Sequence, residues 1–401
     1  MSTIENQQAP AAVAVAAPPG ALILMLAIAV GALVANLYYA QPLIGLIAPE
    51  LGIRPDVAGA VVSITQIGYG VGLFLLVSLA DLVENKRLVL IALGGTVLAL
   101  VGAALSTTAA LFLIASFAIG VCSTGAQVLL PFAAQLVPVA SRGKVVGNVM
   151  AGLLTGILLA RPLALFISGS FGWRAVFWIS AVLMLAIGAA LFRMMPRHQP
   201  RGGMSYGQIL KSMVGLVRDT PVLRRRSAYQ GLLFAAFNLF WTTAPLMLAQ
   251  QFGLSQQGIA LFALAGVGGA AAAPFAGRLA DRGLVRGTTF AAMAVMSLAF
   301  FATGWAVAAG ALIVLAVLSV IIDAAVQTNQ VASQRVIFAL PGEIRGRLNA
   351  IYMTTVFLGG AVGSTLGTVT YHWGGWGATA TAGVVLGVLA LLLFATEFRR
   401  Q

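Results

Sequence analysis

Apolar residues form long stretches along the chain, and short polar or charged segments separate them. Cutting the sequence at its charge clusters and at its Pro and Gly turns leaves about twelve such stretches. Each approaches the roughly twenty residues that a membrane-spanning helix needs, and backbone groups in lipid must be satisfied within the segment. The pattern therefore predicts an all-α polytopic membrane protein with twelve transmembrane helices. We place them at residues 21–46, 56–80, 88–106, 109–137, 144–168, 174–194, 227–249, 256–279, 288–308, 310–337, 347–371 and 376–396.

Composition agrees with a chain that folds in a bilayer. Hydrophobic residues make up 60% of it and charged residues 8%, whereas about a quarter of the residues of a soluble domain are charged. The net charge of +13 first suggests a nucleic-acid partner, but the basic residues gather in alternate loops, which is the positive-inside pattern. We therefore expect no nucleic-acid partner and place both termini in the cytoplasm. The basic residues of these loops are Lys86 and Arg87, Arg142 and Lys144, Arg193 through Arg226, Arg278, Arg282 and Arg286, Arg345 and Arg347, and Arg399 and Arg400.

The second half of the chain repeats the first at an offset of 200 to 203 residues. Four matches occur in the same order: Asn36-Leu37-Tyr38-Tyr39 with Asn238-Leu239-Phe240-Trp241, Leu79-Ala80-Asp81 with Leu279-Ala280-Asp281, Pro138 and Arg142 with Pro341 and Arg345, and Trp173 with Trp376. The repeat predicts two six-helix bundles in parallel orientation. We expect a disordered cytoplasmic tail at 1–20, an N-terminal bundle at 21–194, a cytoplasmic linker at 195–226 with an amphipathic helix, and a C-terminal bundle at 227–401.

Two ionisable residues lie deep in the predicted spans, Arg161 and Asp323. A charge at the centre of a spanning helix costs about 2.5–3.5 kcal/mol on an insertion scale, so such residues usually face a cavity, a partner or a substrate. Their depths in the membrane are comparable, which makes a pair between them plausible. The alternative for Arg161 is direct binding of an anionic substrate through its forked donors.

A polar stripe follows Asp323 along its helix. Gln327, Gln330 and Gln334 succeed it at spacings of four, three and four, which places all of them on one helical face. That face is expected to line a substrate cavity, although Gln and Asn also join helices by hydrogen bonds. The other candidate substrate-binding residues are Asn36, Tyr39, Gln41, Gln66, Tyr69, Asn238 and Trp241.

Two repeat-equivalent loops combine an acid with bases at the cytoplasmic ends of helices. Breaking and remaking such pairs could bias inward-facing against outward-facing states, whereas the alternative is that these charges only anchor the topology. The gating candidates are Asp81, Arg87, Arg142, Asp281, Arg282 and Arg345.

Two six-helix repeats joined by a basic linker resemble the major facilitator superfamily, and in detail the bacterial drug:proton antiporters and sugar efflux permeases. The residues that carry this resemblance are "NLYYAQPLIGLIAPELG", "GILLAR", "FGWRAVFW" and "GRLADRG". It implies a transporter of the bacterial inner membrane, with the fifth helix at the interface of the halves. The chain departs from the antiporter pattern at Ala160-Arg161, where that group has Gly-Pro, and at Ser116, where it has an Arg linked to proton coupling.

These observations lead to one main functional hypothesis. We expect a monomeric, proton-coupled exporter of drug-like, amphipathic or sugar-like molecules, in which Asp323 binds the proton and Arg161 takes part in coupling. A uniporter, or an organic-anion transporter that uses Arg161, is the alternative. No phosphate-binding loop or metal-ligand cluster is visible, so we expect neither a cofactor nor a metal, and not an enzyme. A channel or a receptor is less favoured, because two parallel repeats suit a rocking transporter.

Overall fold

The structure is a computed structural model, and it describes residues 20–80, 82–138, 141–197, 199, 203–341 and 344–397, without the side chains at 267, 270–271, 273–274 and 280–281. All regular structure in these ranges is helical. The first half contains α1 (Gly20–Ala35), η1 (Gln41–Leu43), α2 (Ile44–Glu50), η2 (Pro55–Val57), α3 (Ala60–Leu79), α4 (Asn85–Leu105), α5 (Ala109–Ser123), α6 (Gly125–Gln135), α7 (Arg142–Phe171) and α8 (Trp173–Met194). The remainder consists of α9 (Tyr206–Asp219), α10 (Pro221–Phe252), α11 (Gln256–Ala265), η4 (Gly266–Ala271), α12 (Ala272–Asp281), α13 (Val285–Ala308), α14 (Leu312–Phe338) and α15 (Arg345–Ala395).

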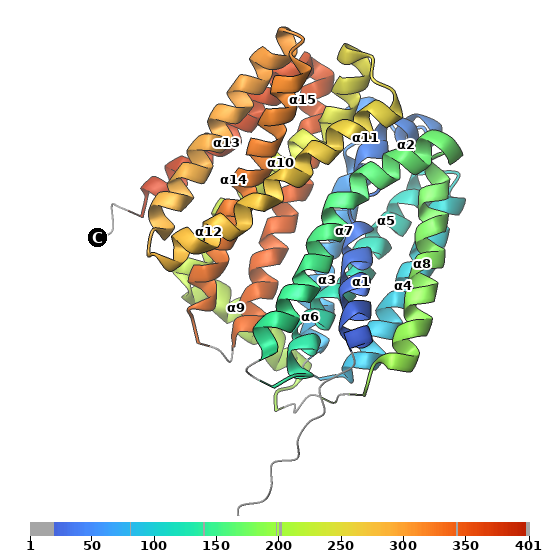
Figure 1. Cartoon of the computed structure of the whole chain (residues 1–401), viewed down its shortest axis with the longest axis vertical. Coiled ribbons are helices and arrows are strands. Elements are labelled where there is room, and N and C mark those ends of the chain that lie inside the picture. Colours follow the sequence, from blue (N-terminus) through green and yellow to red (C-terminus); the bar gives the residue numbers. More distant parts are fainter. Residues whose placement is uncertain are drawn as a thin grey trace, which may run out of the picture.

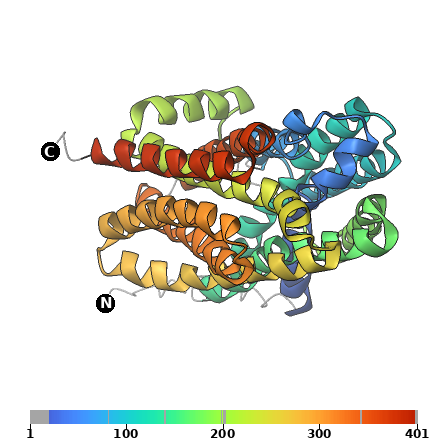
Figure 2. The ribbon, with the colours of Figure 1, turned by 90° about the horizontal axis from the view of Figure 1, so that it is seen from above.

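The helices form two bundles side by side, α1 to α8 in one and α10 to α15 in the other (Figures 1 and 2). In the described residues, nine helices are long and apolar enough to cross a membrane. The all-α membrane class is therefore confirmed, while the count of twelve crossings and the domain boundaries stay predictions. The tail at 1–20 falls almost entirely outside the described residues. We call the end of the bundle that carries α9 the linker end, and the opposite end the far end.

The first predicted span is not one continuous helix. α1 ends at Ala35, and residues 36–40 form turns before η1 and α2 continue the path. Pro42 lies at the start of η1; it has no N–H to donate, and it disfavours helical geometry at the residue before it. The interruption lies in the second half of the predicted span 21–46, and it breaks the helical backbone between Asn36 and Gln41.

Other predicted spans also differ in continuity. The span at 109–137 is divided at Thr124, and the span at 256–279 is divided by η4, a segment with three glycines. The spans 347–371 and 376–396 are instead the two arms of α15, which bends at Gly374 and Gly375. Gly375 has φ of 61°, a left-handed value that favours glycine. α10 begins at Pro221, ahead of the predicted start at 227, because Pro at the first helical position suits a helix N-terminus.

Small residues bring corresponding helix pairs together in both halves. A Cβ on Gly156 of α7 would lie 2.1 Å from the carbonyl oxygen of Gly31 in α1. A Cβ on Gly363 of α15 would lie 1.9 Å from the carbonyl oxygen of Ala235 in α10. Both contacts require glycine, and they occur at equivalent places in the two repeats. Gly152 and Gly359, each four residues earlier, make matching contacts with Ala27 and Gly231, so glycines at four-residue spacing mark packing within each half.

Hydrogen bonds join the two halves near the far end. The Gly59 amide donates to Thr368 Oγ1 at 3.1 Å, and Ser63 Oγ donates to the Ala361 carbonyl at 2.7 Å. At the linker end, a pocket of about 410 Å³ lies between the halves, with walls from α3, α6, α7, the end of α14 and the start of α15. A second pocket of about 330 Å³ lies between the halves at the far end, where Pro49 of α2 faces Leu246 of α10 and Tyr371 of α15.

α9 in the linker is amphipathic, as the sequence predicts. It begins with a capping box between Ser205 and Gln208, and its buried residues are Ile209 and Met213. Ser78 Oγ of the first half donates to Met213 Sδ at 3.2 Å. Arg347 of the second half donates to Ser212 Oγ at 2.7 Å. α9 therefore contacts both halves at the linker end.

Candidate functional site

Arg161 lies at the interface of the two halves, in the middle of α7. It is 5% exposed. Its Nε donates to Gln41 Oε1 at 2.9 Å, which is possible because the break in the first span exposes Gln41 to α7. The guanidinium carbon lies 4.9 Å from the ring centroid of Trp241 and 5.0 Å from those of Tyr38 and Phe237. The charge is therefore held by aromatic faces and one amide oxygen.

Asp323 of α14 is 6% exposed and accepts a hydrogen bond of 2.8 Å from Trp241 Nε1 to its Oδ1. Trp241 thus offers its ring face to Arg161 and its N–H edge to Asp323. No nitrogen of Arg161 lies within 4.0 Å of a carboxylate oxygen of Asp323. The predicted direct pair is absent from this structure, and the indole connects the two charges instead. We call Arg161, Trp241 and Asp323 the central triad.

The central triad is packed against the interruption of the span at 256–279. A Cβ on Gly266 would lie 2.8 Å from Asp323 Oδ2 and 2.8 Å from Cζ2 of Trp241. A Cβ on Gly269 would lie 2.3 Å from the Asp323 Cβ. The glycines of η4 are therefore needed where this backbone approaches the carboxylate and the indole.

A network of amides and hydroxyls extends from Arg161 across the two halves. Gln41 Nε2 donates to Asn238 Oδ1 and to Thr242 Oγ1, both at 3.1 Å. Gln66 Nε2 of α3 donates to the same Asn238 oxygen at 2.5 Å. Three predicted residues of separate helices thus converge on the Arg161 side of the site, where they hold α3, η1 and α10 together.

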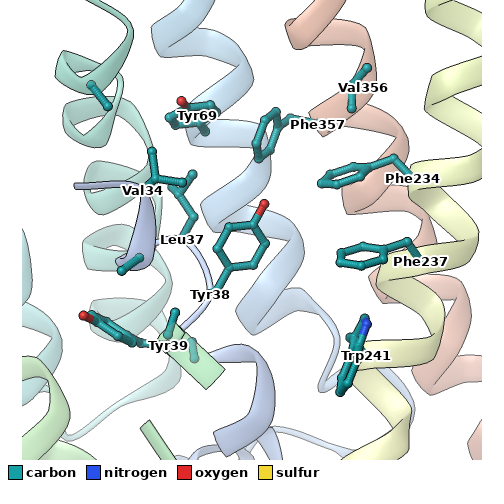
Figure 3. Packing of buried hydrophobic residues seen from close by; sticks show 14 of the residues in the cluster. Val34, Leu37, Tyr38, Tyr39, Tyr69, Phe234, Phe237, Trp241, Val356 and Phe357 are labelled. Atoms are coloured by element: carbon teal, nitrogen blue, oxygen red, sulfur yellow. The ribbon is translucent and has the colours of Figure 1, made fainter. Parts of the chain in front are cut away.

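Aromatic residues line the path between this network and the linker-end pocket. Figure 3 shows Tyr69, Phe357, Phe234, Phe237, Tyr38 and Trp241 following one another. The rings of Tyr69 and Phe357 have centroids 4.4 Å apart, and those of Phe357 and Phe234 are 5.3 Å apart. Tyr69 accepts a hydrogen bond from Gln127, which lines the linker-end pocket. Aromatic side chains from both halves therefore separate the pocket from the central triad.

Two predicted residues of the first span lie elsewhere. Asn36 accepts a hydrogen bond of 2.6 Å from Ser180 of α8, inside the first half. Tyr39 is buried, and Figure 3 shows it directed away from Trp241, while Tyr38 is directed toward the aromatic group. The turns at 36–40 place neighbouring tyrosines on opposite sides. The sequence alone would not have selected Tyr38 over Tyr39.

The predicted glutamine stripe of α14 is half-buried at Gln327, Gln330 and Gln334. Gln330 Oε1 is 3.5 Å from Gln230 Nε2 in α10. Gln230 also accepts a hydrogen bond of 2.7 Å from Asn329.

Gln230 and Asn329 are buried polar residues that the sequence analysis did not select. Gln230 precedes Asn238 by eight residues, which is about 2.2 helical turns, and this spacing was the available signal. Arg226 is a further buried cation, bound to Thr289 Oγ1 at 2.8 Å near the linker end.

The predicted gating residues lie at the linker end. Arg87, Arg142, Arg282 and Arg345 are exposed, and the side chain of none of the four has a hydrogen bond or ion pair with another described residue. Arg345 lines the linker-end pocket. Asp81 and the side chain of Asp281 lie outside the described residues, so the expected acid–base pairs stay predictions. The described residues contain no group of three or more His, Cys, Asp or Glu that could hold a metal ion.

Comparison with known proteins agrees with this arrangement. The family model described as Major Facilitator Superfamily matches residues 24–336 and 227–401. The uncharacterized transporter YgaY of Escherichia coli O157:H7 is 37% identical over 386 residues, which are 95% of this chain and 96% of that protein. A chloramphenicol resistance protein of Streptomyces lividans is 28% identical over 265 residues, 64% of this chain and 66% of that one.

A solved structure extends the agreement to the fold. The D-xylose–proton symporter matches with a TM-score of 0.72 at 18% identity, covering 92% of this chain and 97% of that one. At this identity the likeness shows the fold alone. Together with the family match and the relative that spans nearly the whole chain, it establishes that this membrane protein belongs to the Major Facilitator Superfamily of transporters.

Proposed function

We propose that the protein is a proton-coupled secondary transporter that exports small organic molecules across the bacterial inner membrane. The central triad is the observation that carries this proposal. It unites a buried cation from the first half with a buried acid from the second half, at the place where both halves meet. A site that depends on both halves is sensitive to their relative movement, as alternating access requires.

The arrangement of the halves supports an inward-facing state in this proposal. With the basic loops in the cytoplasm, the linker end is cytoplasmic and its pocket of about 410 Å³ opens inward. The hydrogen bonds of Gly59 and Ser63 to α15 then join the halves at the outer end, beside the smaller pocket of about 330 Å³. When the linker end closes, Asp81 and Asp281 would pair with the exposed arginines, which are Arg87, Arg142, Arg282 and Arg345. Both termini would lie in the cytoplasm.

Asp323 is the proton-binding group in this mechanism. Among the described residues it is the one buried acid. When neutral, Asp323 needs no compensating cation. When ionised, it attracts Arg161, and the indole between them keeps the two groups near each other without a direct bond. A substrate whose binding moves Arg161 toward Asp323 would favour the ionised carboxylate and release its proton, which couples substrate to proton by reciprocal linkage.

The composition of the site supports neutral or amphipathic substrates. Aromatic rings from both halves and the amides of Gln41, Gln66 and Asn238 can pack against a ring and bond its polar groups. The relative named for chloramphenicol resistance agrees with export of a drug-like compound.

An organic-anion transporter is the second candidate, and one observation favours it. Arg161 Nη2 is buried and has no hydrogen-bond partner. A carboxylate or phosphate on the substrate would supply the missing acceptor. In that case Arg161 would bind substrate directly, and an Arg161→Gln variant would raise the KM for anions while leaving neutral substrates unaffected.

Proteoliposomes with an internal pH dye and an imposed pH gradient test the proposal. A panel of drugs, sugars and organic anions is added to the wild type and to Asp323→Asn. Proton flux that depends on substrate in the wild type and disappears in Asp323→Asn is the expected result. Substrate movement without proton flux, equal in both proteins, would make this a uniporter and overturn the coupling role of Asp323.

A further inference from the structure

A further cavity is separate from the central triad, on the outside of the first half. It is a groove of about 800 Å³ between α4 and α8, which lie side by side (Figure 1). Its apolar lining includes Ile91, Leu185 and Phe192, which are 62%, 63% and 65% exposed. The groove is therefore open to the outside of the bundle, the side that faces lipid in a membrane protein.

The groove has a charged mouth at the linker end only. Lys86 and Arg87 of α4 and Arg197 after α8 line it, together with one acid, Glu84. Three cations against one acid leave a net charge of +2 at the mouth. Lys86 Nζ lies 5.4 Å from the ring centroid of Phe192, so the cation is held above the apolar lining.

The dimensions of the groove match one leaflet of a bilayer. Its lining runs along α4 from Arg87 to Val97, which is roughly 15 Å at 1.5 Å per residue. Half of a hydrocarbon core about 30 Å thick has the same depth. Gly94 and Gly188 line the groove, and no heavy atom lies within 4 Å of a Cβ placed on either one. These glycines widen the groove where an acyl chain would lie.

We propose that this groove binds an anionic phospholipid of the linker-side leaflet. Its phosphate would lie at Lys86, Arg87 and Arg197, and an acyl chain would extend between α4 and α8. Basic pockets between spanning helices recognise anionic headgroups by charge, and the apolar lining excludes a free phosphate as the preferred ligand. The inference is independent of the proposed transport function.

Native mass spectrometry of the full chain in detergent tests the proposal. Phosphatidylglycerol and phosphatidylcholine with identical acyl chains are titrated separately, and we expect tighter binding of phosphatidylglycerol. Each cation at a membrane surface strengthens anionic-lipid binding about fivefold, so Lys86→Gln with Arg197→Gln should weaken phosphatidylglycerol binding about 25-fold. Binding of phosphatidylcholine should not change. The matched control is Lys144→Gln with Lys211→Gln, which removes the same charge from exposed positions outside the groove.

A second variant tests the groove without changing its charge. Gly188→Leu fills open space in α8, and Leu is a better helix former than Gly, so the fold should be kept. It should lower phosphatidylglycerol occupancy, whereas Gly287→Leu, at an equally open position of α13, should not. Equal affinity of the wild type for both lipids, or unchanged phosphatidylglycerol binding by Gly188→Leu, would overturn the proposal.

Discussion

An arginine, a tryptophan and a carboxylate meet in two regions of this molecule, with different results. At the far end, Arg174 lies 4.2 Å from the ring centroid of Trp173, and Trp173 Nε1 donates to Glu50 at 2.5 Å. Arg174 also forms a direct ion pair with Glu50 and donates to the Ser106 carbonyl at 2.9 Å. We call Glu50, Trp173 and Arg174 the far-end triad. It joins α2, α8 and the end of α4 within the first half.

The central triad uses its tryptophan in the same way but lacks the direct ion pair. It is almost completely buried and spans both halves, whereas the side chains of Arg174 and Glu50 are 34% and 50% exposed. A direct ion pair within one bundle connects helices of the same half, which keep their relative positions when the halves move. Two buried charges separated by an indole can change partners when the halves move. The difference indicates a structural role at the far end and a coupling role in the centre.

Replacing each arginine by lysine should separate the two roles most strongly. Lys keeps the charge but loses the planar fork and the Nε donor. Arg161→Lys loses the bond to Gln41, and a hydrogen bond with a charged group contributes about 1.5–3 kcal/mol, so transport should fall on the order of 10-fold to 100-fold. Arg174→Lys keeps an ion pair with Glu50 and should transport normally. Equal initial uptake rates for both variants in proteoliposomes would contradict the comparison.

Replacing each tryptophan by phenylalanine tests the N–H edge alone. Trp241→Phe keeps a ring near Arg161 but removes the donor to Asp323, and we expect proton flux per substrate to fall on the order of 10-fold. Trp173→Phe removes the donor to Glu50, while the ion pair with Arg174 remains. Its proton coupling should match the wild type. If Trp241→Phe couples normally, the indole is only a packing group.

Gly266→Ala perturbs the central triad without changing any charge. The added methyl would lie 2.8 Å from both Asp323 and Trp241, and overpacking of this kind costs about 1–3 kcal/mol. The backbone of Gly266 is right-handed helical, so alanine itself is tolerated there. Transport should fall by up to about 100-fold. Gly258→Ala lies in the preceding helix α11, where the new Cβ would make only ordinary contacts, and should have no effect. Normal transport by Gly266→Ala would show that the carboxylate and the indole move apart freely.

The smallest expected effect concerns Glu50 and pH. Hydrogen bonds from Trp173 and then Arg174 lower the pKa of Glu50 below its ordinary value of 4.5. A lowered pKa stabilises the fold above pH 4.5, and this stabilisation is lost as pH falls below that value. At pH 7, Glu50→Gln should lower the thermal unfolding midpoint by roughly 1–2 °C, as expected for an exposed pair. The two midpoints should converge as pH falls through the lowered pKa of Glu50, and a difference that stays constant on acidification would refute the assignment.

The sequence predicted the class of fold and the two buried charges, because both follow from composition. A long apolar stretch specifies a spanning helix, and a lone charge inside it is too costly to face lipid. The same logic selected Gln41, Gln66, Asn238 and Trp241, all of which lie in the site.

The sequence could not predict which apolar faces are buried by protein and which by lipid. Phe234 and Phe237 of α10 form part of the site, yet an aromatic residue on a helix that is apolar on every side is equally suited to lipid. The sequence does not show which of Tyr38 and Tyr39 faces the site, because their directions depend on the end of α1 at Ala35. The position of Trp241 between Arg161 and Asp323 depends on how α10 is rotated about its axis. Contacts between residues far apart in the sequence determine this rotation, and local sequence patterns do not.

Proton release on substrate binding tests the central claim most directly. The purified protein is placed in weakly buffered detergent solution with a pH dye, and a substrate identified in the proteoliposome panel is added. If substrate binding displaces the proton of Asp323, the wild type should acidify the solution and Asp323→Asn should bind the substrate without doing so. Equal proton release by both proteins, or binding without release by the wild type, would contradict a coupling role for Asp323.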